Sequence, residues 1–105
     1  MNKQRRKELK EQIDKLEELR GEFNSLVEQL EEVKSDLETI KDDEETAYDN
    51  MPESLQEGEK GSLMQVAIGL IEDAIDAVDS VVGDMGSTED NFQEAIDRIH
   101  EAISC

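Results

Sequence analysis

The sequence predicts an all-α fold in which a long N-terminal coiled-coil helix is followed by a two-helix hairpin, and we expect a homo-oligomer. Three observations lead to this prediction. Apolar residues recur at heptad spacing over most of the chain, turn-forming residues gather at two places, and the charges fall between the apolar positions. We therefore expect one domain with three parts: a heptad-repeat helix with a basic N-terminal tip (1–50), a connector (51–60) and a helical hairpin (61–105).

The first helix carries the clearest repeat. With Leu9 at heptad position a, four consecutive heptads keep apolar residues at a and d, which is typical of a coiled coil. A helix from about residue 3 to 47 would be roughly 68 Å long at 1.5 Å per residue, so it must pack against other helices. The predicted oligomer seam consists of these a and d residues: Leu16, Leu19, Phe23, Leu26, Leu30, Val33, Leu37 and Ile40.

The second helix is expected from about residue 61 to 82, with an apolar stripe wide enough to contact two neighbours. Residues 83–86 (Gly-Asp-Met-Gly) then predict a turn, and Ser87 or Thr88 would cap a third helix. These helices either line the first helix in series, or the third folds back. The relative direction of the packed helices also stays open. A parallel dimer would pair Asp36 with Lys41, whereas an antiparallel fold-back would place the lysines of the first helix beside carboxylates of the second.

Pro52 makes helical geometry unfavourable at Met51, so the first helix should end near residue 49 or 50. The run Asp49-Asn50-Met51-Pro52-Glu53-Ser54-Leu55-Gln56, followed by Glu59-Lys60-Gly61, resembles a segment of short acidic helical proteins of bacteriophages and mobile elements. The resemblance covers roughly residues 40–80 and implies a small mobile-element protein made in a bacterial cytoplasm. It implies no activity.

Charge is distributed unevenly along the chain. The 105 residues carry 11 Lys and Arg against 29 Asp and Glu, a net charge of -18, yet residues 1–20 alone are positive by two. Such a charge makes direct nucleic-acid binding unfavourable. One cysteine excludes an internal disulfide framework, and we expect no membrane span and no secretory signal. These features predict a cytoplasmic protein of a bacterial host cell.

The candidate partner-binding residues lie at the end of the first helix and in the connector: Asp42, Asp43, Glu44, Glu45, Tyr48, Asn50, Gln56 and Lys60. The alternative is a purely structural corner with Tyr48 and Leu55 as apolar plugs. Under both interpretations, substituting Gln56 and Lys60 by Ala should leave stability nearly unchanged. Residues 42–45 lack the spacing of a calcium loop, and we predict neither a metal site nor a cofactor.

No catalytic motif is present, so we predict no enzyme. His100 has no second ligand at metal-binding spacing, and the terminal Cys105 should be exposed. The leading hypothesis is a non-catalytic phage or mobile-element protein that inhibits a basic host defence or DNA-binding protein through a surface resembling nucleic acid. The alternatives are an oligomeric sponge for a small nucleotide-like ligand, held by Lys60 and glycine amides, and a coiled-coil scaffold or assembly protein.

Overall fold

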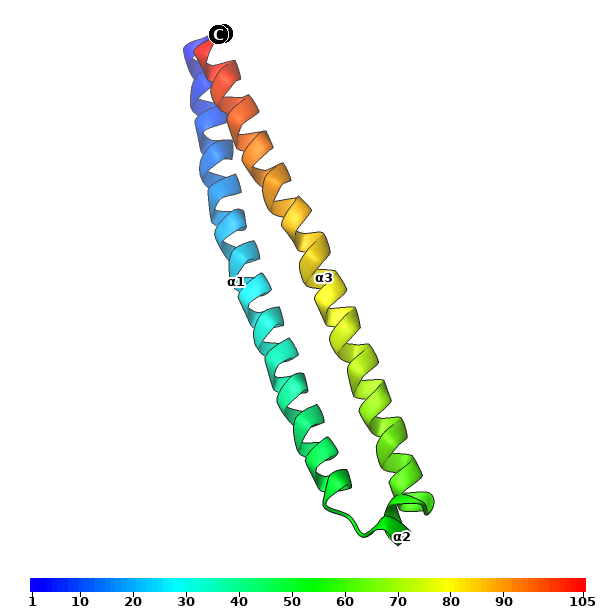
Figure 1. The fold of residues 1–105 in the computed structure, drawn as a ribbon. Coiled ribbons are helices and arrows are strands. Elements are labelled where there is room, and N and C mark those ends of the chain that lie inside the picture. Colours follow the sequence, from blue (N-terminus) through cyan, green and yellow to red (C-terminus); the bar gives the residue numbers. More distant parts are fainter. The chain divides into compact units, whose positions relative to one another are not determined.

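The computed structural model describes all 105 residues and contains three helices and no strands. Figure 1 shows the helix α1 (Lys3–Asp49), the short α2 (Glu53–Gln56) and the helix α3 (Glu59–Ser104). The all-α fold class with a long first helix is confirmed, and α1 ends where Pro52 predicts. None of the three helices has both the length and the apolar character needed to cross a bilayer.

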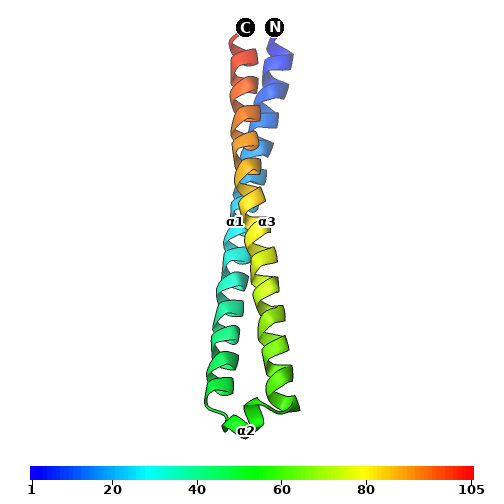
Figure 2. The same ribbon diagram turned by 45° about the vertical axis from the view of Figure 1, so that its right-hand side comes forward.

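The chain divides into two compact units, to each of which α1 and α3 contribute a segment. The terminal unit consists of Met1–Gln29 and Val82–Cys105, which run antiparallel with both chain ends at the same end of the unit (Figure 2). Asn2 caps α1, because its side-chain oxygen accepts a hydrogen bond from the Arg5 amide at 2.8 Å. The seam buries Ile13 and Ile96, which are 6% and 3% exposed.

Two further contacts complete the seam of the terminal unit. The rings of Phe23 and Phe92 pack at a centroid distance of 5.6 Å and an interplanar angle of 51°. Beside them, Arg20 donates a hydrogen bond to Gln93 and lies 3.9 Å from a Glu89 carboxylate oxygen. Apolar packing in this unit is therefore flanked by a polar cross-link between α1 and α3.

The connector unit consists of Leu30–Val81 and contains the second half of α1, the α2 corner and the first half of α3. Its helical segments also run antiparallel, and Ile75 is the buried apolar residue between them at 8% exposure. Lys34 pairs with Asp79, and Lys41 pairs with Glu72. A step of seven residues towards the C-terminus on α1 thus corresponds to a step of seven residues towards the N-terminus on α3, as in an antiparallel pair. Of the two directions left open by the sequence, the structure has the fold-back.

The predicted break at residues 83–86 is wrong, because α3 continues from Glu59 to Ser104 without interruption and neither Ser87 nor Thr88 begins a helix. A glycine within a helix costs about 1 kcal/mol relative to alanine. The apolar row of α3 keeps its seven-residue spacing through Met85 to Phe92, and both side chains are partly buried. A continuous helix keeps this row against α1, and this packing offsets the local cost of Gly83 and Gly86. The expected pair of helices is thus one helix.

The predicted seam of α1 is divided between two environments. Its a residues Leu16, Phe23, Leu30 and Leu37 are partly buried. Its d residues are about half exposed: Leu19 49%, Leu26 49%, Val33 45% and Ile40 54%. The intrachain seam uses position e instead, where Ile13, Val27 and Tyr48 are buried or partly buried. The chain by itself therefore leaves about half of each d residue in water.

Candidate interaction surface

Two lysines of α1 cross-link the connector unit. Lys34 Nζ lies 2.8 Å from Asp79 Oδ1, and Lys41 Nζ lies 2.9 Å from Glu72 Oε1. The hydrogen bond to Asp79 and attraction to its charge raise the pKa of the Lys34 ammonium. The hydrogen bond to Glu72 likewise raises the pKa of Lys41, against a smaller lowering by desolvation. Both lysines therefore keep their charge and direct it towards α3.

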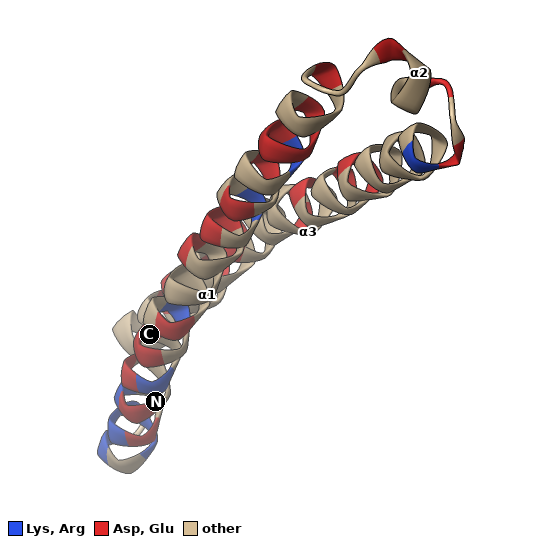
Figure 3. Ribbon diagram, turned by 90° about the horizontal axis from the view of Figure 1, so that it is seen from below, with Lys and Arg blue, Asp and Glu red and all other residues tan.

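This pairing leaves the outside of residues 31–45 of α1 almost purely acidic. Between residues 31 and 45, Lys34 and Lys41 are the only cations, and both are partly buried in ion pairs with α3. We define the outer acidic face as the six exposed carboxylates of this segment: Glu31, Glu32, Asp36, Glu38, Asp42 and Asp43. Figure 3 shows the acidic positions along α1.

The charge density of this segment is high. Residues 31–45 hold eight carboxylates on a helix of about 22 Å, or about one per 3 Å. A DNA strand carries one phosphate charge per roughly 3.4 Å. The connector unit as a whole contains 16 acidic residues and three lysines, and so accounts for -13 of the chain's -18. A basic partner would therefore be attracted to the connector unit.

The corner between α1 and α3 is held together by three polar contacts. The Tyr48 carbonyl accepts hydrogen bonds from Gln56 Nε2 at 2.8 Å and from the Met51 amide at 3.1 Å, and Gln65 Nε2 donates to the Tyr48 hydroxyl at 2.8 Å. Gly61 is buried against α2, where a Cβ atom would overlap the Gln56 carbonyl. The expectation that Gln56 is dispensable for stability disagrees with this geometry, because its partly buried amide joins α2 to α1.

The predicted binding residues fall into three groups. Tyr48 and Gln56 are brought together in the corner, whereas Asp42, Asp43, Asn50 and Lys60 are exposed. Glu44 and Glu45 are partly covered, and Glu45 Oε1 lies 3.7 Å from Lys41 Nζ. A shallow groove of about 300 Å³ beside the corner is lined by Glu45, Tyr48, Asp49, Gln65 and Ile68. Its two carboxylates would repel an anionic ligand.

The sequence predicts carboxylates of the second helix beside the lysines of α1 in a fold-back, but it does not single out Glu72 and Asp79, which direct the lysines inward. Glu72 and Asp79 are seven residues apart, as are Lys34 and Lys41, so matched spacing on two antiparallel helices was the available signal. No group of three or more His, Cys, Asp or Glu side chains is arranged to hold a metal ion. Cys105 is exposed, as predicted.

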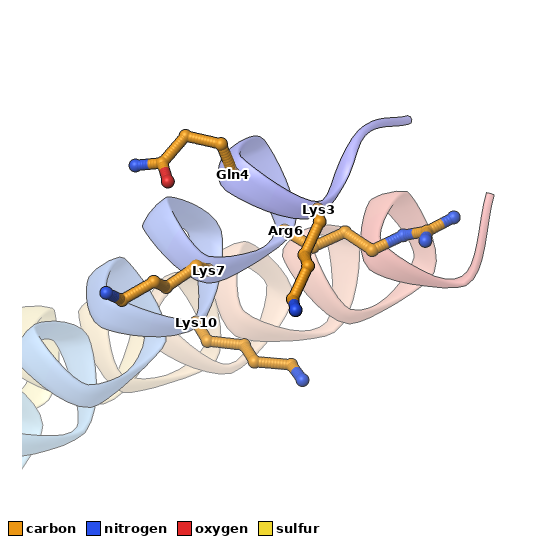
Figure 4. Close-up of a pocket in the computed structure, with 5 residues that line it drawn as sticks. All are labelled: Lys3, Gln4, Arg6, Lys7 and Lys10. Carbon is orange, nitrogen blue, oxygen red and sulfur yellow. The ribbon is translucent and has the colours of Figure 1, made fainter.

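The basic tip, residues 2–7, lies in the terminal unit. Lys3, Gln4, Arg6, Lys7 and Lys10 border an open hollow of about 630 Å³. Figure 4 shows that these side chains all come from α1 and point in different directions, with Arg6 drawn across the C-terminal end of α3. Arg6 Nε is buried without a hydrogen-bond partner. The cationic side chains that border the hollow are therefore distributed along one helix and do not converge on a single point.

Comparison of the chain with protein-family models, curated proteins and solved structures gives no significant match. The resemblance of the connector to segments of mobile-element proteins therefore stays a prediction.

Proposed function

We propose that this protein is a non-catalytic binding protein that engages a basic surface of a partner protein through the outer acidic face of α1. The observation that supports the proposal is the inward pairing of Lys34 and Lys41 with α3, which leaves the six exposed carboxylates outside any ion pair. Such a face attracts a basic partner over a distance of about 10 Å at 0.1 M salt.

The partner class follows from charge density. A surface that normally binds the phosphates of DNA meets a similar spacing of negative charges on residues 31–45. We therefore propose that the partner is a nucleic-acid-binding protein, and that the acidic helix competes with nucleic acid for its basic surface. In the context that the connector motif implies, this would be a DNA-binding or defence protein of a bacterial host, inhibited by a phage or mobile-element product in the cytoplasm.

The test uses immobilised protein and bacterial lysate, followed by DNA competition on each captured protein. We expect a basic DNA-binding protein or nuclease that elutes as salt is raised and loses DNA affinity when the acidic protein is added. The variant Glu31→Gln, Glu38→Gln, Asp42→Asn should lose this capture. The control Glu11→Gln, Asp14→Asn, Glu18→Gln removes the same charge from exposed positions of the terminal unit and should retain it.

Three outcomes would contradict the proposal. Equal capture by both triple variants would show that the outer acidic face is not the binding surface. Nucleotide absorbance that co-purifies with the protein, without a protein partner, would favour the ligand sponge. Large ordered assemblies of the purified chain would favour the scaffold.

A further inference from the structure

The connector unit has a seam that is closed on one flank and open on the other. The ion pairs Lys34–Asp79 and Lys41–Glu72 cover one flank. Val33 and Ile40 each precede one of these lysines and therefore lie about 100° around α1 from it. These two residues are 45% and 54% exposed, so the chain by itself leaves about half of each in water.

The corresponding row of α3 lies on the same flank. Ala74 and Val81 are seven residues apart and take heptad position d, as Val33 and Ile40 do on α1. Viewed from one end of the pair, the chain turns in opposite senses along two antiparallel helices. The two d rows therefore face the same side of the pair. Leu63 and Leu70 extend this row around α3 and are 62% and 63% exposed.

We define the open flank as this set of uncharged residues on the two helices: Val33, Ile40, Leu63, Leu70, Ala74 and Val81. Seven of the ten large exposed hydrophobic residues of the chain lie in the connector unit, and five of the seven belong to the open flank. The most acidic part of the molecule thus has an apolar surface that an isolated chain leaves in water. Association with a partner would cover this surface.

The exposed area of the whole chain is large enough to include a dimer contact. The chain exposes 7481 Å² and buries only Ile13, Ile75 and Ile96 among its apolar residues. A compact monomer of 11.9 kDa would expose about 5,900 Å², so the excess is about 1,500 Å². A dimer of standard size covers about 800 Å² on each partner, which this excess can supply.

The shape of the open flank also suits an identical chain. Two antiparallel helices that present matched seven-residue rows form half of a four-helix bundle, and the other half needs the same repeat over the same length. The α1 row offers the large Ile40 at the level where the α3 row offers the small Ala74. Placing α1 of one copy over α3 of the other therefore fits a large side chain against a small one in both directions, as a two-fold dimer requires.

We propose that two copies of this chain pair through the open flank, so that their connector units form a four-helix bundle. Asp36, Asp43 and Asp73 are exposed on either side of the open flank, and each copy contributes the same negative charge. Salt therefore strengthens the dimer by screening this repulsion. The opposite response is expected if copies associate through the basic tip and an acidic surface.

The experiment is sedimentation equilibrium of the full chain between about 0.05 and 0.5 M NaCl, with salt screening of exposed charges as the variable. The unmodified protein should sediment at twice 11.9 kDa, with a Kd that falls as salt rises. Ile40→Glu should raise the Kd by about 100-fold or more, because the dimer would bury an unpaired charge. The control Thr39→Glu adds the same charge at the adjacent exposed position and should remain dimeric.

Leu70→Glu provides a second test from α3, and circular dichroism of each variant should retain the helical spectrum, because both side chains are more than half exposed. A monomer at every salt concentration would overturn the proposal, and so would a trimer or tetramer. Dimers that persist equally in Ile40→Glu and Leu70→Glu, or that dissociate as salt rises, would place the contact elsewhere.

Discussion

Replacing Gly83 and Gly86 by alanine tests whether α3 is continuous. Both glycines lie inside the helix, and a Cβ atom added at either position meets no other atom within 4 Å. Alanine is favoured over glycine by about 1 kcal/mol in a helix interior, so the double variant should raise the free energy of unfolding by about 2 kcal/mol. If residues 83–86 formed a turn instead, the same change would be neutral or destabilising.

The assay is thermal unfolding followed by circular dichroism at one fixed protein concentration, since association would shift the midpoint. Each kcal/mol should raise Tm by about 4–8 °C for a chain of this size. Gly69→Ala is a positive control, because its Cβ also meets open space, whereas Gly61→Ala should destabilise by overlap with the Gln56 carbonyl. A lower Tm for the double variant, with Gly69→Ala still stabilising, would refute the continuous helix.

Three further predictions concern the seam and the corner. Gln56→Ala should lower the free energy of unfolding in urea by about 1 kcal/mol, because α2 loses its hydrogen bond to a carbonyl of α1, whereas the exposed Lys60→Ala should not. The raised pKa of Lys41 means that its pairing with Glu72 stabilises the fold below pH 10.5 and is lost as pH rises through the raised value. When the pH is raised above 10.5, the free energy of unfolding should therefore fall less in Lys41→Met than in the unmodified protein. An equal fall in both proteins would contradict the pairing. Ile96→Ala should cost about 2–4 kcal/mol in the same urea assay, and a loss below about 1 kcal/mol would mean that α3 does not pack there.

In α3, the apolar periodicity was a better guide to the fold than the two glycines were. The heptads of α1 and the helix stop before Pro52 were predictable because both depend on residues close in sequence. The turn at residues 83–86 was predicted from two glycines, although Met85 and Phe92 continue the apolar row of α3 in register. In this helix, packing along the whole row outweighs local propensity, and the unbroken row was the better signal.

The division of α1 into covered and open rows was less accessible from sequence. A heptad pattern marks a and d as equivalent, but the partner helix decides which of its flanks is used. In α3, Ile75 and Ile96 at position e are the most buried residues, which rotates the seam towards e on both helices. The d residues Val33 and Ile40 are left outside as a result. Only the pairing of α1 with α3 reveals this shift.

The structural surroundings of the candidate binding residues were only partly predictable, for a similar reason. Exposed carboxylates such as Asp42 follow directly from heptad position. The structural role of Gln56 depends on a contact with the Tyr48 carbonyl, eight residues away across the corner, and composition gives no sign of it. Charge on one helix face is predictable, whereas a side-chain contact across a turn requires the coordinates.

The antiparallel register of the connector unit is the central claim, because it creates both the outer acidic face and the open flank. Spin labels at residue 38 on α1 and at residue 76 or 62 on α3 test it most directly, with Cys105→Ser and with labelled chains diluted into unlabelled ones. The ion pairs place 38 nearly level with 76, whereas 62 lies 14 residues away on the same face of α3, about 21 Å along the axis. The 38–76 distance should be clearly the shorter. Equal distances, a shorter 38–62 distance, or no short distance in the diluted sample would contradict the fold-back.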